Sequence, residues 1–220
     1  MCVNFELTAV FPALIPLTLA IASLLSGASR LSDNTRQGIL KSISVAVVIS
    51  AILITVCHIE KPEDPHALLA MNNVNLIVLL LVCFMTIVLV KFSQRYLSGE
   101  TKTHRYWRWL FLSLTSVSIV IVSNHLLIFW LGWVSISLCF HRLLLFYPDR
   151  PRAVLAAHKK FILARVSELS LLSSFVLLYT QHGTFYLSEI SHYYLTSASA
   201  AELSVAETVA AILLALTALI

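Results

Sequence analysis

The chain has 220 residues, of which 59% are hydrophobic and 12% are charged, and its mean hydropathy is +0.88. Soluble domains are nearer to half apolar and a quarter charged, so this composition excludes an ordinary soluble domain and indicates an integral membrane protein. The net charge is +4, and the basic residues cluster between the apolar segments and near their ends. Because Lys and Arg in such connections act as anchors beside anionic headgroups, we expect contact with membrane lipid and no binding of nucleic acid.

Seven apolar segments follow one another along the chain, and each is long enough, or nearly so, to cross a bilayer as a helix. In lipid every backbone polar group must be satisfied internally. The segments therefore predict an all-α, polytopic transmembrane helix bundle that forms a single domain over residues 1–220. The predicted helices cover residues 7–25, 39–57, 74–90, 106–122, 126–147, 161–179 and 205–220.

The two ends of the chain differ from ordinary membrane-helix boundaries. Glu6 precedes the first segment, and Pro12 and Pro16 interrupt it. These features argue against a signal peptide, so we expect a helix that is retained. The last segment stops in mid-run with no cap and no basic flank, which predicts a chain truncated at its carboxyl end.

The Lys and Arg residues fall almost entirely on one side of the predicted helices. Of the 15, Lys61 alone lies in a connection of the other set. The positive-inside rule then places the amino terminus outside and three basic connections in the cytoplasm. We expect Arg36, Arg105 and Arg150 inside, and Asp64 and His192 outside.

The sequence carries no signature of a cofactor or of a metal site. The cysteines Cys2, Cys57, Cys83 and Cys139 have no paired spacing and are interpreted as small buried side chains. Residues 58–66, HIEKPEDPH, could bind a metal loosely, but a solvated acidic loop explains them better. No CxxCH, GxGxxG or P-loop pattern is present. We expect no cofactor, no metal and no catalytic centre in this chain.

Three ionisable residues near the start of the sixth segment are the first candidates for a proton or ion pathway. Arg165 and Glu168 are i,i+3 neighbours that can pair on one helix, and Lys159 precedes them on an adjacent face. Charged groups at membrane depth are costly and by default mark a pathway or a pairing site. The alternative is that Lys159 reaches the membrane surface as an anchor while Arg165 and Glu168 form a structural pair.

His141, near the inner end of the fifth segment, is the next candidate. An imidazole titrates near neutral pH and suits a proton relay. The alternative is a histidine that lies at the membrane interface beside Arg142. Trp130 and Trp133 on the same segment are interpreted as packing or interface aromatics.

Three stretches resemble the antiporter-like subunits of respiratory complex I (subunit L type) and of Mrp cation/proton antiporters. They are VKFSQRYLSGE, SNHLLIFWLGW and AAHKKFILARVSE, within residues 84–174. The resemblance matches Lys159, Arg165 and Glu168 to the Lys, Arg and terminal Asp of a family motif. Val134 departs from the family, because it replaces the Glu that follows Trp133 and that pairs with a membrane lysine for proton transfer.

The run FYPDRPRAVLAAHKKF, with His141 and Arg142 before it, resembles a divergent branch of that family, the DabB subunits of inorganic-carbon pumps. This implies a multi-pass subunit in a bacterial inner membrane that supplies protons or cations to a zinc-containing DabA partner. One alternative is a proton-translocating subunit L of an NADH-quinone oxidoreductase. Others are a cation/proton antiporter subunit and a structural subunit that conducts nothing. Quinone reduction by the whole complex and the identity of the neighbouring genes would separate the DabB interpretation from the subunit L interpretation.

Overall fold

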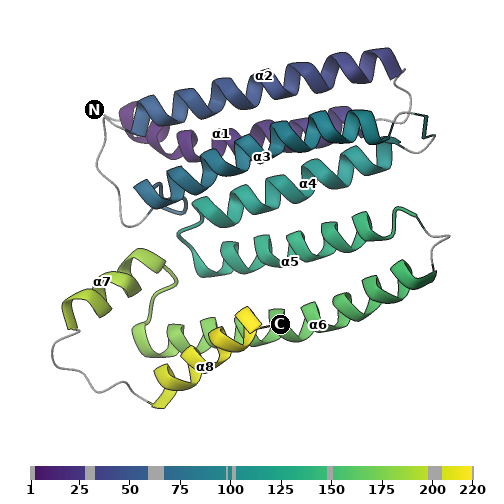
Figure 1. Cartoon of the computed structure of the whole chain (residues 1–220). Coiled ribbons are helices and arrows are strands. Elements are labelled where there is room, and N and C mark those ends of the chain that lie inside the picture. Colours follow the sequence, from purple (N-terminus) through teal and green to yellow (C-terminus); the bar gives the residue numbers. More distant parts are fainter. Residues whose placement is uncertain are drawn as a thin grey trace. The chain divides into compact units, whose positions relative to one another are not determined.

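The computed structural model describes residues 3–27, 33–58, 67–97, 99–100, 103–147, 151–197 and 205–219. Within these ranges the regular structure is α-helical (Figure 1), which confirms the expected all-α fold. The helices are α1 (Val3–Ser26), α2 (Asp33–His58), α3 (Asn73–Tyr96), α4 (Thr103–Val122), α5 (Leu126–Leu144), α6 (Pro151–His182), α7 (Leu187–Ser197) and α8 (Val205–Leu219).

Each predicted segment coincides with a helix of the structure. The structure also contains α7, which is not among the predicted segments. The apolar pattern does not predict α7, because its 11 residues are too few to cross a bilayer and include polar side chains throughout. α6 begins at Pro151, earlier than the predicted residue 161. Proline suits the first position of a helix, and the Ala and Leu residues among positions 152–160 favour a helix ahead of the longer apolar run.

Four described helices have the length and apolar character of a membrane span: residues Thr35–Val56 of α2, and α3, α5 and α6. Shorter apolar helices cover Pro12–Ser26 and Val205–Ala218. Cys83 and Cys139 are buried and free, as expected. Arg150 and the acidic residues 59–66 lie outside the described residues.

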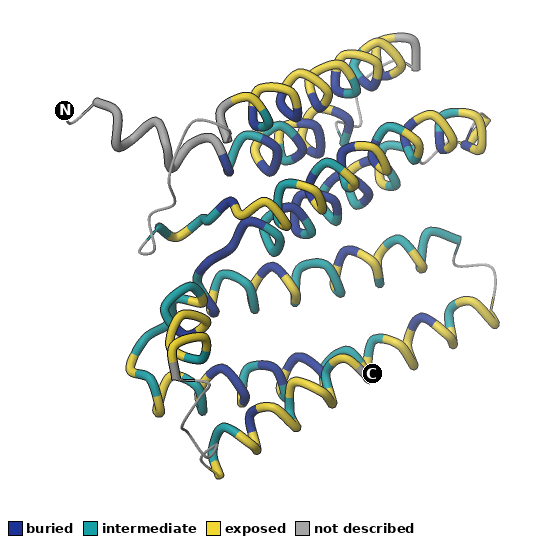
Figure 2. Tube along the Cα trace, turned by 60° about the vertical axis from the view of Figure 1, so that its left-hand side comes forward, coloured by how far each residue is buried: buried dark blue, intermediate teal, exposed yellow. Residues whose placement is uncertain are grey.

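The chain divides into two compact units, and the first contains α1 to α4. In this unit α1 packs against α2 and α4, and α3 packs against α2 and α4. Its buried core includes Leu19, Val47 and Phe111, while Val45 and Ile52 on α2 are exposed apolar side chains. Buried and exposed residues alternate along the helices (Figure 2). An apolar exposed face beside a buried one is what a helix at a lipid boundary requires.

The second unit contains residues 67–68 and α5 to α8, and Asn124 holds its segments together. The Asn124 backbone N–H donates to the carbonyl oxygen of Leu68, and its own carbonyl accepts from the N–H of Leu187. The side-chain amide donates to the Ala67 carbonyl at 2.9 Å and the Ser188 hydroxyl at 3.0 Å. Its Oδ1 accepts from the Ser188 N–H at 3.0 Å. One buried side chain thus fixes the start of α7 beside the start of α5.

Candidate functional site

The candidate site lies where α5 and α6 pack together in the second unit. On α5, residues 130, 134, 137 and 141 recur at spacings of four, three and four, so they share one face of the helix. On α6, residues 158, 161, 165 and 168 do the same at spacings of three, four and three. The side chains of these two faces form the contacts described below, and together they are called the α5–α6 interface.

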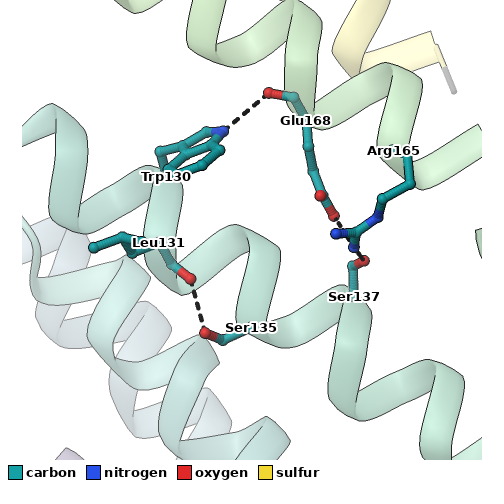
Figure 3. A network of polar contacts seen from close by, with 6 residues as sticks. All are labelled: Trp130, Leu131, Ser135, Ser137, Arg165 and Glu168. Atoms are coloured by element: carbon teal, nitrogen blue, oxygen red, sulfur yellow. Dashed lines mark hydrogen bonds and ion pairs between the residues drawn. The ribbon is translucent and has the colours of Figure 1, made fainter.

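Glu168 and Arg165 form an ion pair at the centre of the α5–α6 interface (Figure 3). Arg165 Nη2 lies 2.7 Å from Glu168 Oε1 and donates to the Ser137 hydroxyl oxygen on α5, also at 2.7 Å. The Glu168 side chain is 5% exposed and that of Arg165 is 34% exposed. An ion pair removed from water is tolerated only when further hydrogen bonds support it, and Ser137 supplies one from the facing helix.

Trp130 makes a second polar link across the interface. Its indole N–H donates to the backbone carbonyl oxygen of Glu168 at 2.9 Å (Figure 3). A buried indole N–H needs such a partner, and here the partner belongs to the residue whose side chain forms the ion pair. Sequence reasoning identifies Trp130 as a packing residue only, and it does not identify Ser137. Their seven-residue spacing, two helical turns, is the signal that places both on one face.

Val134 lies between Trp130 and Ser137 on this face of α5 and is half-buried. Because its side chain is apolar, α5 contributes no carboxylate at this level. The acid of the interface comes instead from Glu168 on α6. The structure therefore has one carboxylate, one guanidinium and one hydroxyl in direct contact.

His141 lies toward the end of the interface that is near Pro151. Its ring is 4.6 Å from the ring of Phe161 and 5.6 Å from that of His158. Among the described residues its buried Nδ1 has no hydrogen-bond partner, whereas Nδ1 of the exposed His158 lies 2.8 Å from the Val154 carbonyl oxygen. Two imidazoles thus meet at this end, and sequence reasoning identifies only the first of them as a candidate.

Lys159 lies away from the Arg165–Glu168 ion pair. It is exposed, and at 100° per residue it lies about 120° around α6 from Arg165. Its neighbour Lys160 lies over the ring of Phe140, with 3.6 Å between Nζ and the ring centre. The predicted site residues are therefore arranged as a contacting pair, Arg165 and Glu168, with His141 and Lys159 nearer the start of α6.

No group of three or more His, Cys, Asp or Glu side chains that could hold a metal ion occurs in the part of the chain that the structure describes. The α5–α6 interface itself contains groups that can carry protons and charge. A carboxylate and two imidazoles can take up and release protons. A guanidinium can stabilise a neighbouring carboxylate at membrane depth.

Residues 123–220 match the family model described as NADH:quinone oxidoreductase/Mrp antiporter, TM. A probable inorganic carbon transporter subunit DabB from Hydrogenovibrio crunogenus is 46% identical over 150 residues, which are 68% of this chain and 28% of that protein. Subunit DabB2 of the same description, from Halothiobacillus neapolitanus, is 37% identical over 56% of this chain and 22% of its own length.

The chain is also similar to a respiratory subunit in sequence, at lower identity, and to one solved structure in fold. The NADH-quinone oxidoreductase subunit L of Escherichia coli is 27% identical over 56% of this chain and 20% of its own length. A chain of the membrane-bound sulfane sulfur reductase, an archaeal respiratory membrane complex, superposes with a TM-score of 0.75 at 17% identity. That match covers 93% of this chain and 33% of the other, and it shows the fold alone.

The family match over residues 123–220 confirms the resemblance to antiporter-like membrane subunits that the sequence indicated, and the all-α fold and the apolar spans agree with it. Of the relatives reported above, the chain is more similar to the DabB subunit, at 46% identity, than to subunit L, at 27%. It spans about a quarter of the length of the DabB proteins that it matches.

Proposed function

We propose that the chain is the membrane subunit of an energy-coupled inorganic-carbon pump, acting on CO2 or bicarbonate. It supplies a proton or cation pathway to a zinc-containing DabA-like partner. Support comes from the two DabB relatives, whose names describe inorganic carbon transport, and from their higher identity, 46% and 37% against 27% for subunit L. The chain brings no catalytic centre and no cofactor of its own, and zinc belongs to the partner.

The observation that carries the pathway is the ion pair between buried Glu168 and half-buried Arg165 on α6, a helix long and apolar enough to cross a membrane. An ionisable group at membrane depth is energetically costly, so its presence there is explained if the group exchanges a proton. In this pathway Glu168 takes and releases the proton. Arg165 holds its carboxylate while it is charged, and His141 and Lys159 lie toward the end from which ions enter or leave.

A partner-dependence experiment tests the transport function. The complex is expressed in a carbonic-anhydrase-deficient host that requires added CO2, with and without the DabA-like subunit. We expect growth in air only when both subunits are present, because this chain contributes a pathway and no hydration chemistry. Growth in air with this chain alone would overturn the accessory role.

A neutral variant of the central acid tests the pathway. Glu168→Gln keeps the side-chain volume and removes the charge, so we expect uptake per assembled complex to be abolished. The change also removes the ion-pair partner of Arg165, and because Arg165 is 34% exposed this costs less than the roughly 3–5 kcal/mol of a fully buried pair. Uptake must therefore be divided by the amount of assembled complex. The exposed Glu100→Gln is the matched control, and equal uptake per complex in both variants would contradict the proposal.

The second candidate function is that of a proton-translocating subunit of an NADH-quinone oxidoreductase or of a cation/proton antiporter. The family model over residues 123–220 and the 27% identity to subunit L favour it. NADH-driven quinone reduction by the purified complex would support the oxidoreductase. Exchange of Na⁺ for protons in membrane vesicles, without carbon uptake, would support the antiporter.

A further inference from the structure

A second cluster of titratable side chains lies at the carboxyl end of α6. It contains His182 of α6, Tyr194 of α7 and Glu207 of α8, and is called the α7 cluster. The Tyr194 hydroxyl donates to Glu207 Oε1 at 2.9 Å. His182 Nε2 lies 3.2 Å from the same hydroxyl oxygen and 3.6 Å from Glu207 Oε1. The side chains of His182 and Glu207 are only 8% and 12% exposed.

The phenol in the α7 cluster stays protonated at neutral pH. Burial, followed by the hydrogen bond to Glu207, raises the pKa of Tyr194 to about 12. A neutral hydroxyl can accept from an imidazole N–H while it donates to a carboxylate. The other ring beside His182 is that of Tyr193, at 4.8 Å, so tyrosines from α7 and a carboxylate from α8 face the imidazole.

Hydroxyl groups follow α6 from the central ion pair toward this cluster. Ser167, next to Glu168, donates to the Thr217 carbonyl oxygen of α8 at 3.3 Å. Ser174, two turns further on, donates to the Ala210 carbonyl at 3.0 Å. Both serines are buried. Fourteen residues separate Glu168 from His182, which is about 21 Å along the helix axis. The two buried serines thus face α8, whereas Arg165 of the central pair contacts Ser137 of α5.

We propose that the α7 cluster is the proton-exchanging group at the carboxyl end of the pathway, with His182 and Glu207 as the residues that take and release the proton and Tyr194 as the hydroxyl between them. This inference rests on the proposed function. In the transfer, protonated His182 gives its Nε2 proton to the Tyr194 oxygen as the Tyr194 hydroxyl proton moves to Glu207. Imidazolium and carboxylate become neutral imidazole and carboxylic acid, and the phenol is regenerated. The cluster is reset when Glu207 releases its proton and His182 takes up another, and passage in the opposite direction follows the same steps in reverse.

Isosteric variants separate proton exchange from the mere fastening of α7. His182→Gln and Glu207→Gln remove a titratable group, while their amides can still hydrogen-bond to Tyr194. His192→Gln is the matched control, because His192 is an exposed histidine on α7. Proton translocation is measured with a pH-sensitive dye in inverted membrane vesicles that hold the assembled complex. The rate is divided by the amount of complex and followed across neutral pH.

We expect His182→Gln and Glu207→Gln each to lower the rate per complex by about tenfold or more and to change its pH profile, as loss of a proton carrier does. The assembled amount and the rate of His192→Gln should stay at the parental level. Unchanged rates per complex, with or without less assembled protein, would overturn the inference and leave a cluster that only fastens α7.

The Glu168→Gln variant, measured in the same vesicles, separates the two proposals. If Glu168→Gln is impaired and the α7-cluster variants are not, the pathway stands and the inference fails. If the α7-cluster variants are impaired and Glu168→Gln is not, the cluster keeps its role and the central pair loses it.

Discussion

Trp130 and Glu168 are joined across two helices by a hydrogen bond from the indole N–H to the backbone carbonyl oxygen, at 2.9 Å. The bond is one of the side-chain contacts that hold α5 in register with α6. With Trp130 opposite Glu168, the residue two turns further along α5 is Ser137, which meets Arg165. The geometry of the central ion pair therefore depends on a contact that neither charged side chain makes.

Replacing Ser137 tests how much the facing helix supports the ion pair. Ser137→Ala removes the acceptor of one Arg165 hydrogen bond, and bonds to charged groups are worth about 1.5–3 kcal/mol. We expect a lower midpoint of thermal unfolding for the purified protein in detergent. Ser135→Ala is the matched control, because the Ser135 hydroxyl donates to the Leu131 carbonyl of its own helix (Figure 3). Equal midpoints for the two variants would show that Ser137 contributes nothing.

The part of the site predictable from sequence is the part that lies on one helix. Arg165 and Glu168 are i,i+3 neighbours, so their pairing follows from helical spacing alone, and the structure confirms the contact. The contacts of Ser137, Trp130 and His158 depend on the register of α5 against α6, which side-chain packing sets and no local pattern reveals. α7 could not be predicted for a different reason. Membrane helices are recognised in a sequence by long apolar runs, and α7 is short and polar.

A substitution at Asn124 should loosen the second unit as a whole. The Asn124 side chain makes three hydrogen bonds, to Ala67 and twice to Ser188. Asn124→Ala removes all three and leaves buried partners unsatisfied, at roughly 1–3 kcal/mol for each such group. We expect less folded protein in the membrane and faster proteolysis near α7. The control is Ser191→Ala, an exposed serine of α7; if both variants fold alike, Asn124 does not hold these segments together.

The orientation of the chain is a prediction from the distribution of basic residues. We expect single cysteines at Arg36 and Arg105 to resist an impermeant thiol reagent added from outside, and a cysteine at His192 to react with it. Arg36 is buried and Arg105 is exposed, so position 105 is the informative one on the inner side. The labelling is repeated after the membrane is opened, which should expose position 105. Reaction of position 105 and protection of position 192 in intact cells would reverse the orientation.

Lys159 distinguishes a pathway residue from a membrane anchor. It lies nine residues before Glu168, or about 13 Å along α6, and on another face from Arg165. Because it makes no contact with the pair, Lys159→Met should leave the amount of assembled complex unchanged. If its charge belongs to the pathway, uptake per complex should fall, by less than in Glu168→Gln. Lys160→Met is the matched control, a neighbouring lysine whose ammonium lies over Phe140. Parental uptake in Lys159→Met would assign Lys159 to the membrane surface and leave His141, Arg165 and Glu168 as the residues of the pathway.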